Sequence, residues 1–391
     1  MTPVCITAAT MVTAVGAGLD AHADALRRKR SGLVPCDLPG VDIDTWIGRV
    51  EGVDAVHLDG SLSAYECRNH RLALLGLEHE GFSDRVKAAA ARHGKDRVGV
   101  FMGTSTSGIA ETERAYAESH GGALPDWFDF RRTQSIHALG EFVRERFNLS
   151  GVGHTVSTAC SSSAKAVVAA LRHLAYGLCD SALVGGVDSL CLTTLYGFHS
   201  LELTSPEPCR PFDAGRRGIS IGEAAGFVLL ERGNDAGEYL ITGWGESSDG
   251  HHMSTPHPEG VGAALAMRQA LSSSGLAATD IDYVNLHGTG TLSNDRAEDR
   301  AIRAVFGNGV PCAGTKGYTG HTLGAAGIVE LILSMLSLRE GLVPGTCQTR
   351  RQDPDLGVHL CLDPEPRPVR HVLSNSFGFG GSNCSLVISR Q

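Results

Sequence analysis

VSTACSSSAKAVVAALRHLAYG, residues 156–177, places one cysteine and three serines between an apolar lead-in and a helix-forming run. The run from Ala164 to Tyr176 is apolar on nearly every face of a helix and ends before Gly177, which predicts a helix buried in the centre of the molecule. Cys160 stands at the start of this helix, where free N–H groups and the helix dipole favour negative charge. We therefore expect a thiol with a lowered pKa, held as a nucleophile on a strand-to-helix turn of the nucleophile-elbow kind.

Short β-rich runs alternate with helical patterns along the rest of the chain, which predicts an α/β architecture. The other expected helices cover residues 261–274 and 325–339. Three pairs of segments recur in the same order: VGVFMGTS and YVNLHGTG, CSSSAKAVVAALRHLAYG and HTLGAAGIVELILSMLSLREG, SALVGGVDSL and HVLSNSFGFGG. This weak repeat predicts a duplicated fold with two central helices back to back. The alternative is that any α/β protein offers such matches by chance.

The composition excludes several classes of protein. Hydrophobic residues make up 42% of the 391 residues, which is typical of a globular chain. The net charge of -9 argues against binding to nucleic acid. No apolar run reaches the roughly 18 residues of a membrane span, and the N-terminus lacks a basic leader, so we expect a cytoplasmic protein. The 11 cysteines form no CxxC pair, which argues against a structural zinc site or a disulfide scaffold.

Two histidines occupy settings similar to that of the cysteine. His287 follows a buried strand in YVNLHGTGT, and His321 begins the second central helix, the position that the repeat makes equivalent to Cys160. A single histidine in such a place is often only a satisfied core residue, but the repeat favours a shared site. Lys316 lies five residues before His321 without the preceding glycine of a phosphate-binding loop, and Glu330 is its expected ion-pair partner.

Four of these segments resemble the signatures of a known family. TACSSS (158–163), HGTGT (287–291), TKGYTGHTLGAAG (315–327) and NSFGFGGSN (375–383) resemble those of the β-ketoacyl synthases, the decarboxylating condensing enzymes of the thiolase superfamily. The resemblance covers essentially the whole chain. It implies a duplicated thiolase-like fold, layered α-β-α-β-α, with halves at residues 1–235 and 236–391. It also implies a stand-alone acyltransferase of the type II elongating class.

The resemblance assigns the chemistry residue by residue. Cys160 is expected to take the acyl chain as a thioester. His287 and His321 are expected to bind the malonyl thioester carbonyl and to stabilise the enolate formed as carbon dioxide leaves. Lys316 and Glu330 resemble the pair that fixes the environment of the histidines. No metal or separate cofactor is implied, because the substrates arrive on the phosphopantetheine arm of acyl carrier protein.

Further residues resemble those that shape the family's substrate channel. Phe379 matches the gating aromatic, and its N–H and that of Cys160 are the expected oxyanion-hole donors. Thr289 and Thr291 match the hydroxyls that hold the pantetheine arm, and Asp295 matches a structural carboxylate. The expected pocket floor consists of Ser107, Gly108 and Ile109. The histidine-rich loop that holds His251, His252 and His257 is not expected to bind a metal.

The resemblance implies acyl carrier protein as the partner, and a dimer as the assembly. Because both proteins are acidic, docking requires a local basic patch, for which we expect Arg68, Arg71, Arg131, Arg132 and Arg210. A homodimer is expected, and a heterodimer with a ketosynthase-like subunit is the alternative.

Three other functions remain as alternatives from the sequence. The chain can be a non-decarboxylating or initiating condensing enzyme, a non-catalytic partner of the chain-length-factor type, or a cysteine hydrolase. The retained cysteine and two histidines favour decarboxylative elongation. Acyl length, saturation and pathway stay open between fatty acid, polyene and polyketide synthesis.

Overall fold

The computed structural model describes residues 4–233 and 237–391. Each half of the chain contributes five main strands. Those of the first half are β1 (Val4–Thr13), β5 (Val98–Gly103), β6 (Gly153–Val156), β7 (Ser181–Asp188) and β9 (Ala224–Arg232). Those of the second half are β10 (Tyr239–Ser248), β11 (Tyr283–Leu286), β12 (Pro311–Gly314), β16 (His371–Gly378) and β17 (Ser382–Arg390).

The order of these strands repeats between the halves. From the centre outward, β1-β9-β7-β5-β6 on one side mirrors β10-β17-β16-β11-β12 on the other. The two sets join where Val4–Ile6 pairs antiparallel with Tyr239–Ile241. The segments that recur in the sequence, β5 with β11 and β7 with β16, therefore occupy equivalent places, and the duplication predicted from the repeat is confirmed.

Smaller strands extend this framework. β2 (Gly16–Ala17) pairs with β1, and β14 (His359–Leu360) lies beyond β12. Two separate small sheets consist of β3 (Val34–Pro35), β4 (Trp46–Gly48) and β8 (Ile221–Gly222), and of β13 (Leu342–Val343) and β15 (Glu365–Pro366). The strand β8 matters for the site, because its backbone bonds to the residues around His321.

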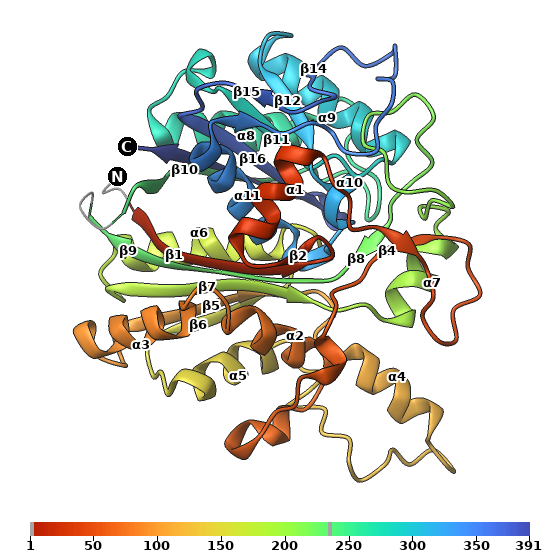
Figure 1. Ribbon diagram of the computed structural model, residues 1–391, viewed down its shortest axis with the longest axis vertical. Coiled ribbons are helices and arrows are strands. Elements are labelled where there is room, and N and C mark those ends of the chain that lie inside the picture. The colour runs from red at the N-terminus through yellow and green to blue at the C-terminus, as the bar shows by residue number, and fades with distance from the viewer. Residues whose placement is uncertain (1–3, 234–236) are drawn as a thin grey trace.

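Helices fill the centre and cover both outer faces, which gives the five layers seen in Figure 1. The central layer contains α6 (Ser162–Ala175) and α11 (Ala326–Glu340). We call the strands β1, β9, β7, β5 and β6 the first sheet and the strands β10, β17, β16, β11 and β12 the second sheet. The outer layers contain α2 (Arg68–Leu77), α3 (Phe82–His93) and α5 (Ala138–Phe147) on the first sheet, and α8 (Val261–Ser274) and α9 (Leu292–Phe306) on the second. The remaining helices are α1 (Leu19–Arg28), α4 (Ile109–Ala117), α7 (Leu192–Ser200) and α10 (Lys316–Thr319). The predicted layered α/β fold is confirmed.

The two central helices approach each other closely because one of them carries a glycine at the contact. A Cβ atom on Gly327 of α11 would lie 2.6 Å from the backbone nitrogen of Ala164 on α6. Every residue of α11 from Ala326 to Leu338 is buried, and the apolar residues of both helices share one cluster with the two sheets. The predicted helices therefore lie back to back, displaced from their expected ends by one or two residues.

Two expectations about the whole chain have different outcomes. The boundary predicted between residues 235 and 236 falls on residues 234–236, outside the described residues, and stays a prediction. Within residues 4–233 and 237–391, no helix has both the length and the apolar character that crossing a membrane requires.

Candidate active site

Cys160 lies in a tight turn between β6 and α6. The residue before it, Ala159, adopts a left-handed conformation with φ of 51°, which is strained for a side chain other than glycine. The hydroxyl of Ser162 accepts the N–H of Thr158 at 2.9 Å and donates to the carbonyl of Ala159 at 2.6 Å. These bonds hold the strained turn and present Cys160 ahead of the helix, as the sequence predicted.

The small residues after Cys160 allow the helix to start against the sheet and against its partner helix. A Cβ on Gly103 of β5 would lie 2.4 Å from the Cα of Ser163, and one on Gly186 of β7 would lie 2.6 Å from its Cβ. The Ser163 hydroxyl accepts the N–H of Ile328 at 2.9 Å, which satisfies a free donor in the first turn of α11. This serine therefore connects the N-termini of the two central helices.

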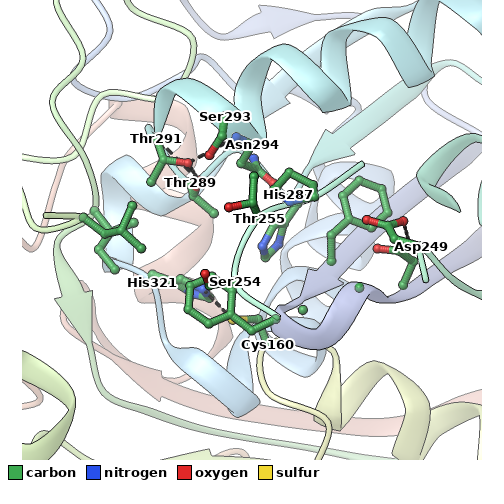
Figure 2. A pocket seen from close by; sticks show the side chains of 18 of the residues that line it. Cys160, Asp249, Ser254, Thr255, His287, Thr289, Thr291, Ser293, Asn294 and His321 are labelled. Carbon is green, nitrogen blue, oxygen red and sulfur yellow. Dashed lines mark hydrogen bonds between the residues drawn. The ribbon is translucent and has the colours of Figure 1, made fainter. Parts of the chain in front are cut away.

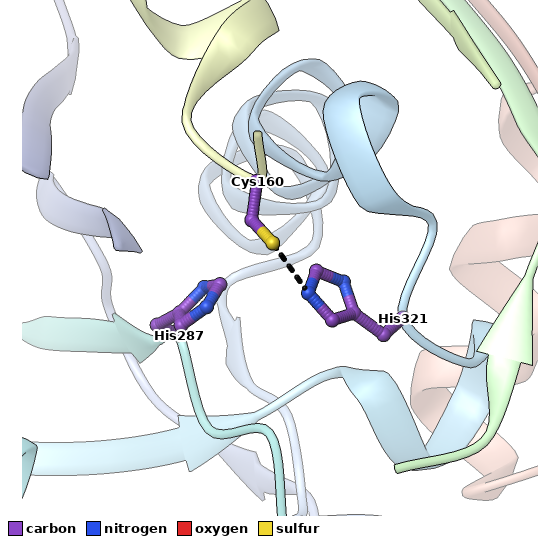
Figure 3. A group of neighbouring side chains, drawn as sticks. All are labelled: Cys160, His287 and His321. Carbon is purple, nitrogen blue, oxygen red and sulfur yellow. Dashed lines mark hydrogen bonds between the residues drawn. The ribbon is translucent and has the colours of Figure 1, made fainter. Parts of the chain in front are cut away.

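The Cys160 thiol faces His321, with Sγ 3.0 Å from Nε2 (Figure 3). Burial raises the pKa of this thiol to about 12, while the charge of Lys316 and the backbone N–H of Phe379 oppose the rise. The lowered pKa expected from the helix start is therefore wrong. The apolar surroundings outweigh the helix N-terminus, and the thiol is protonated at rest.

His321 is held by its backbone and by one of its ring nitrogens. Its N–H donates to the carbonyl of Ser220 at 2.7 Å, and its carbonyl accepts from Gly222 at 2.9 Å, so β8 fixes it in place. Its Nδ1 accepts the N–H of Leu323 at 3.3 Å, which puts the ring hydrogen on Nε2, the atom that faces Cys160. Burial lowers the pKa of His321 well below its ordinary value, so the ring is neutral.

His287 stands immediately after β11 and reaches the same point from the other side. Its Nδ1 lies 3.2 Å from Nζ of Lys316, which places its ring hydrogen on Nε2 as well. Burial, the Lys316 charge and His321 lower the pKa of His287 well below its ordinary value. The two rings are 5.4 Å apart and nearly perpendicular, at 85°. Two neutral imidazoles therefore offer N–H donors beside one thiol.

Lys316 and Glu330 form the predicted ion pair, which is buried. The ammonium group of Lys316 also donates to the backbone carbonyl of His287. Burial raises the pKa of Glu330 to about 7, and the Lys316 charge opposes this rise. Lys316 therefore contacts His287 directly, whereas its charge acts on His321 without a hydrogen bond and lowers the pKa of that ring, a distinction that the sequence did not make.

Glu298 is a functional position that the sequence reasoning missed. It is fully buried on α9, and its two oxygens accept the N–H groups of His287 and Gly288, each at 2.8 Å. The side chain of Asn375 donates to it at 3.2 Å. Glu298 thus fixes the turn that carries His287. No local sequence pattern marks it, because only the fold brings these N–H groups to its carboxylate.

Cys160, His287 and His321 line one cleft with about 590 Å³ of empty space (Figure 2). Its polar wall includes the hydroxyls of Thr289 and Thr291, which lie 2.9 Å apart. The other lining residues are Phe198, Leu203, Ile219, Asp249, Ser254, Thr255, Pro256, Ser293, Asn294, Phe377, Gly378, Phe379, Gly381 and Asn383. The structure therefore brings the predicted threonines and Phe379 to the cysteine and histidines.

The Phe379 loop closes the cleft above Cys160. The Phe379 N–H faces the thiol, and the Phe379 ring packs 5.5 Å from the ring of Phe198. A Cβ on Gly378 would lie 2.8 Å from the Thr158 carbonyl and 3.3 Å from the backbone nitrogen of Cys160. The glycine before Phe379 therefore lets the loop approach the nucleophile turn, which is the arrangement that an oxyanion hole requires.

The residues predicted to form the pocket floor lie apart from this lining. Ser107, Gly108 and Ile109 precede or begin α4, and none of them lines the cleft. The Ser107 hydroxyl donates to the carbonyls of Thr133 and Ser135, at 3.1 and 3.0 Å. In the single chain these residues bind the segment before α5, and a role in acyl binding stays a prediction.

Three of the five arginines predicted to dock a partner are held by the chain's own carboxylates. Arg68 donates to both oxygens of Glu223, at 2.9 and 2.7 Å, and its side chain is only 14% exposed. Arg71 pairs with Glu66 and Arg210 with Glu207. These three guanidinium groups already pair within the chain, and their role in docking stays a prediction. The remaining two, Arg131 and Arg132, are 83% and 49% exposed.

Asp295 has the structural role that was expected, since it accepts the N–H groups of Phe212 and Gly290 and lies 3.3 Å from Arg216. The described residues contain two groups of three side chains that could hold a metal ion, and within each group the possible ligand atoms lie within 4.8 Å of one another. They are Cys160 with His287 and His321, and His359 with Cys361 and Glu365. Neither group includes His251, His252 or His257.

Comparison with known proteins agrees with this site. The model "Beta-ketoacyl synthase, N-terminal domain" matches residues 1–236, and the C-terminal domain model matches residues 239–350. The 3-oxoacyl-[acyl-carrier-protein] synthase 2 of Mycobacterium tuberculosis (strain ATCC 25618 / H37Rv) is 30% identical over 99% of this chain and 97% of its own. Nodulation protein E of Rhizobium meliloti is 35% identical over 75% of this chain and 76% of its own.

Among solved structures, the ketosynthase ApeO in complex with its chain length factor ApeC from Xenorhabdus doucetiae is similar with a TM-score of 0.91. The identity is 38%, and the match covers 100% of this chain and 98% of that chain. These findings favour a catalytic condensing enzyme over a non-catalytic partner, in fatty acid or polyketide elongation. Such enzymes use substrates on carrier-bound phosphopantetheine and have no separate cofactor. The chain therefore belongs to the β-ketoacyl synthase family, the acyltransferase-class condensing enzymes with a thiolase-like fold.

Proposed function

We propose that Cys160 takes an acyl chain from acyl carrier protein as a thioester, and that His287 and His321 then hold a malonyl thioester while it loses carbon dioxide. One observation carries this proposal. The thiol lies 3.0 Å from Nε2 of His321, and the ring hydrogens of both neutral histidines sit on Nε2 because both Nδ1 atoms are occupied. Two donors and one nucleophile thus face the same cleft.

In the loading step, the Cys160 sulfur attacks the carbonyl of the acyl thioester and the pantetheine sulfur leaves. Because burial keeps the thiol protonated and Nε2 of His321 already carries a hydrogen, the Cys160 proton passes to the departing pantetheine sulfur. The oxygen of the tetrahedral intermediate gains negative charge at this stage. The N–H groups of Cys160 and Phe379 stabilise that charge.

In the condensation step, the bond between the malonyl α-carbon and its carboxylate breaks and carbon dioxide leaves. The electron pair moves onto the thioester oxygen, to which the Nε2–H groups of His287 and His321 donate. The enolate carbon then attacks the acyl carbonyl on Cys160, a carbon–carbon bond forms, and the bond from that carbonyl to the Cys160 sulfur breaks. The released thiolate takes up a proton from solvent. Neutral imidazoles can perform this task, because each Nε2–H is a hydrogen-bond donor for the oxygen on which negative charge develops.

The chain is further proposed to work as the catalytic member of a pair with a ketosynthase-like subunit. A chain in the structure of the ketosynthase ApeO with its chain length factor ApeC is 38% identical to this protein over its whole length. A chain in a second structure of this kind, the ishigamide ketosynthase/chain length factor, is 25% identical, with a TM-score of 0.89. The intact Cys160, His287 and His321 support the catalytic role. Purification with candidate partner chains tests the pairing, and a stable homodimer alone would contradict it. The cytoplasmic location stays a prediction that cell fractionation tests.

The reaction is tested with purified protein, acyl carrier protein loaded with an acyl chain, and malonyl carrier protein. We expect release of carbon dioxide and a 3-oxoacyl product longer by two carbons, detected by mass spectrometry. Acyl transfer without carbon dioxide release indicates an initiating or thiolase-type enzyme. Release of free acid from the acyl carrier protein indicates a hydrolase.

A further inference from the structure

Asp188 ends β7 and is fully buried. Its Oδ1 accepts the Thr104 and Thr106 hydroxyls, at 2.6 and 2.9 Å, and the N–H groups of Ser105 and Thr106, at 2.9 and 3.0 Å. Its Oδ2 accepts the Ser105 hydroxyl at 2.5 Å and the N–H of Gly324 at 2.6 Å. All of these donors are neutral amides and hydroxyls, so the carboxylate charge is held by a dense set of hydrogen bonds.

These bonds join two segments that are far apart in the sequence. Residues 104–106 follow β5, whereas Gly324 lies just before α11. The contact with α11 leaves no room for a side chain, since a Cβ on Gly324 would lie 2.7 Å from Oδ2 of Asp188 and 2.8 Å from the Ser105 nitrogen. Asp188 therefore anchors the backbone at the start of the second central helix.

The anchored backbone belongs to the turn that carries His321. Gly324 follows Leu323, whose left-handed φ of 53° is strained for a branched side chain. The Leu323 N–H donates to Nδ1 of His321 and so determines which ring nitrogen carries the hydrogen. The turn is fixed at its other end by the bonds of His321 to β8. Without Asp188, the strained end of the turn loses its anchor.

We propose that Asp188 is a positioning residue that keeps the Leu323 N–H on Nδ1 of His321 and thereby keeps the Nε2–H of His321 directed at Cys160 and the bound thioester. The inference rests on the proposed function of His321 and adds a residue to it. An amide cannot replace the carboxylate here, because an NH₂ group in place of either oxygen would face N–H and O–H donors. The Asp188 charge also raises the pKa of the Cys160 thiol, which provides a second readout.

The test compares Asp188→Asn with Asp299→Asn. Asp299 is a buried carboxylate on α9 that accepts the N–H groups of Gly357 and Val358, at 2.7 and 2.9 Å, and it does not line the cleft. We expect Asp188→Asn to lower decarboxylation of malonyl carrier protein by about 10- to 100-fold, less than the 10²–10³-fold cost of losing a charge-stabilising donor outright. Acyl loading of Cys160 should change by less than about threefold, because it does not use His321. Asp299→Asn should leave the ratio of the two steps unchanged.

Two further measurements separate positioning from general loosening of the fold. In a His321→Ala background, Asp188→Asn should cause no additional loss of decarboxylation, because it acts through that ring. The midpoint of the pH profile for alkylation of Cys160 by iodoacetamide should move to lower pH in Asp188→Asn. If the variant does not fold, Ser105→Ala removes one bond to Oδ2 and should give the same selective effect in weaker form. An equal loss of loading and decarboxylation, or an additive loss in the His321→Ala background, overturns the proposal.

The alkylation measurement also distinguishes failure of the proposed function from failure of the proposed role of Asp188. If the wild-type protein does not decarboxylate malonyl carrier protein, the proposed function fails, yet the alkylation profile still reports whether the Asp188 charge acts on Cys160. If the wild-type protein decarboxylates but Asp188→Asn matches it in rate and in alkylation profile, only the role of Asp188 fails.

Discussion

Cys160 Sγ lies 3.0 Å from Nε2 of His321, although the two residues are 161 positions apart in the chain. Each stands before one of the two central helices, at positions made equivalent by the duplicated strand order. Because Gly327 lets these helices touch at Ala164, their starts meet at one point. The duplication thus supplies the nucleophile from one half and a charge-stabilising imidazole from the other.

Replacing Cys160 by alanine is expected to abolish acyl loading and condensation, because no other cleft-lining residue in the described part of the chain carries a thiol. Mass spectrometry of the protein after incubation with acyl carrier protein measures loading directly. Cys179→Ala is the matched control, since Cys179 is also a buried free thiol but does not line the cleft. Chain extension by Cys160→Ala protein would contradict the mechanism.

Replacing His321 or His287 by alanine is expected to reduce decarboxylation by about 10²–10³-fold, the usual cost of removing one donor to a developing oxyanion. Loading of Cys160 should fall much less, because the enolate forms only after loading. Single-turnover measurements of acyl-enzyme formation and of carbon dioxide release separate the two steps. A selective block of loading by either variant would instead assign that histidine to the thiol.

The sequence predicted the parts of the site that depend on local motifs. Cys160, His287 and His321 stand at the ends of recognisable strand and helix patterns, so their meeting could be inferred from the repeat. Asp188 and Glu298 could not be found in this way, because their roles depend on backbone N–H groups supplied by turns that only the tertiary fold aligns. The pKa of the thiol was misjudged for the same reason. The helix start is visible in the sequence, but the burial that dominates is not.

For the arginines predicted to dock the carrier protein, the sequence likewise does not reveal which charges are paired in the folded chain. Arg68 looks like a free basic residue in the sequence, yet its partner Glu223 lies 155 positions away. Only the folded chain brings that carboxylate to it, and the pair is then removed from solvent. Predicting a docking patch requires knowledge of which charges are already paired.

Glu298 is expected to make the stability of the protein depend on pH. Burial raises its pKa from 4.5 to about 7 in the folded state. Between these values the folded protein binds more protons than the unfolded chain, so the contribution of Glu298 to the free energy of unfolding falls as pH rises. The slope is at most about 1.4 kcal/mol per pH unit. Glu298→Gln should remove this slope.

Denaturant unfolding of both proteins at several pH values measures the difference. Glu330, whose pKa burial also raises to about 7, contributes in the same range, so the quantity to compare is the free energy of unfolding of the wild type minus that of Glu298→Gln. This difference should decrease from about pH 4.5 to about pH 7 and stay level above that range. Parallel profiles for the two proteins would show that Glu298 does not titrate in this window.

Reversing the charge of two exposed arginines tests whether a local basic patch binds an acidic carrier protein to an enzyme of net charge -9. Arg131 and Arg132 lie between α4 and α5 and pair only at 4.0 and 3.9 Å, with Glu141 and Asp129. Contacts at an exposed rim act mainly on the rate of encounter and are screened beyond a Debye length of about 8 Å. Arg131→Glu with Arg132→Glu should therefore raise the KM for acyl carrier protein and flatten its dependence on salt.

Activity with a short pantetheine thioester, which needs no protein docking, should be nearly unchanged in that variant. The control reverses Arg85 and Lys87 to glutamate, because these residues lie on α3, which covers the outer face of the first sheet (Figure 1). It alters the net charge by the same amount, so it accounts for any effect of overall charge. If the control raises the KM for acyl carrier protein equally, attraction depends on net charge and no local patch is needed. If the Arg131 and Arg132 variant loses activity with both substrates equally, these arginines stabilise the segment before α5 and do not bind the partner.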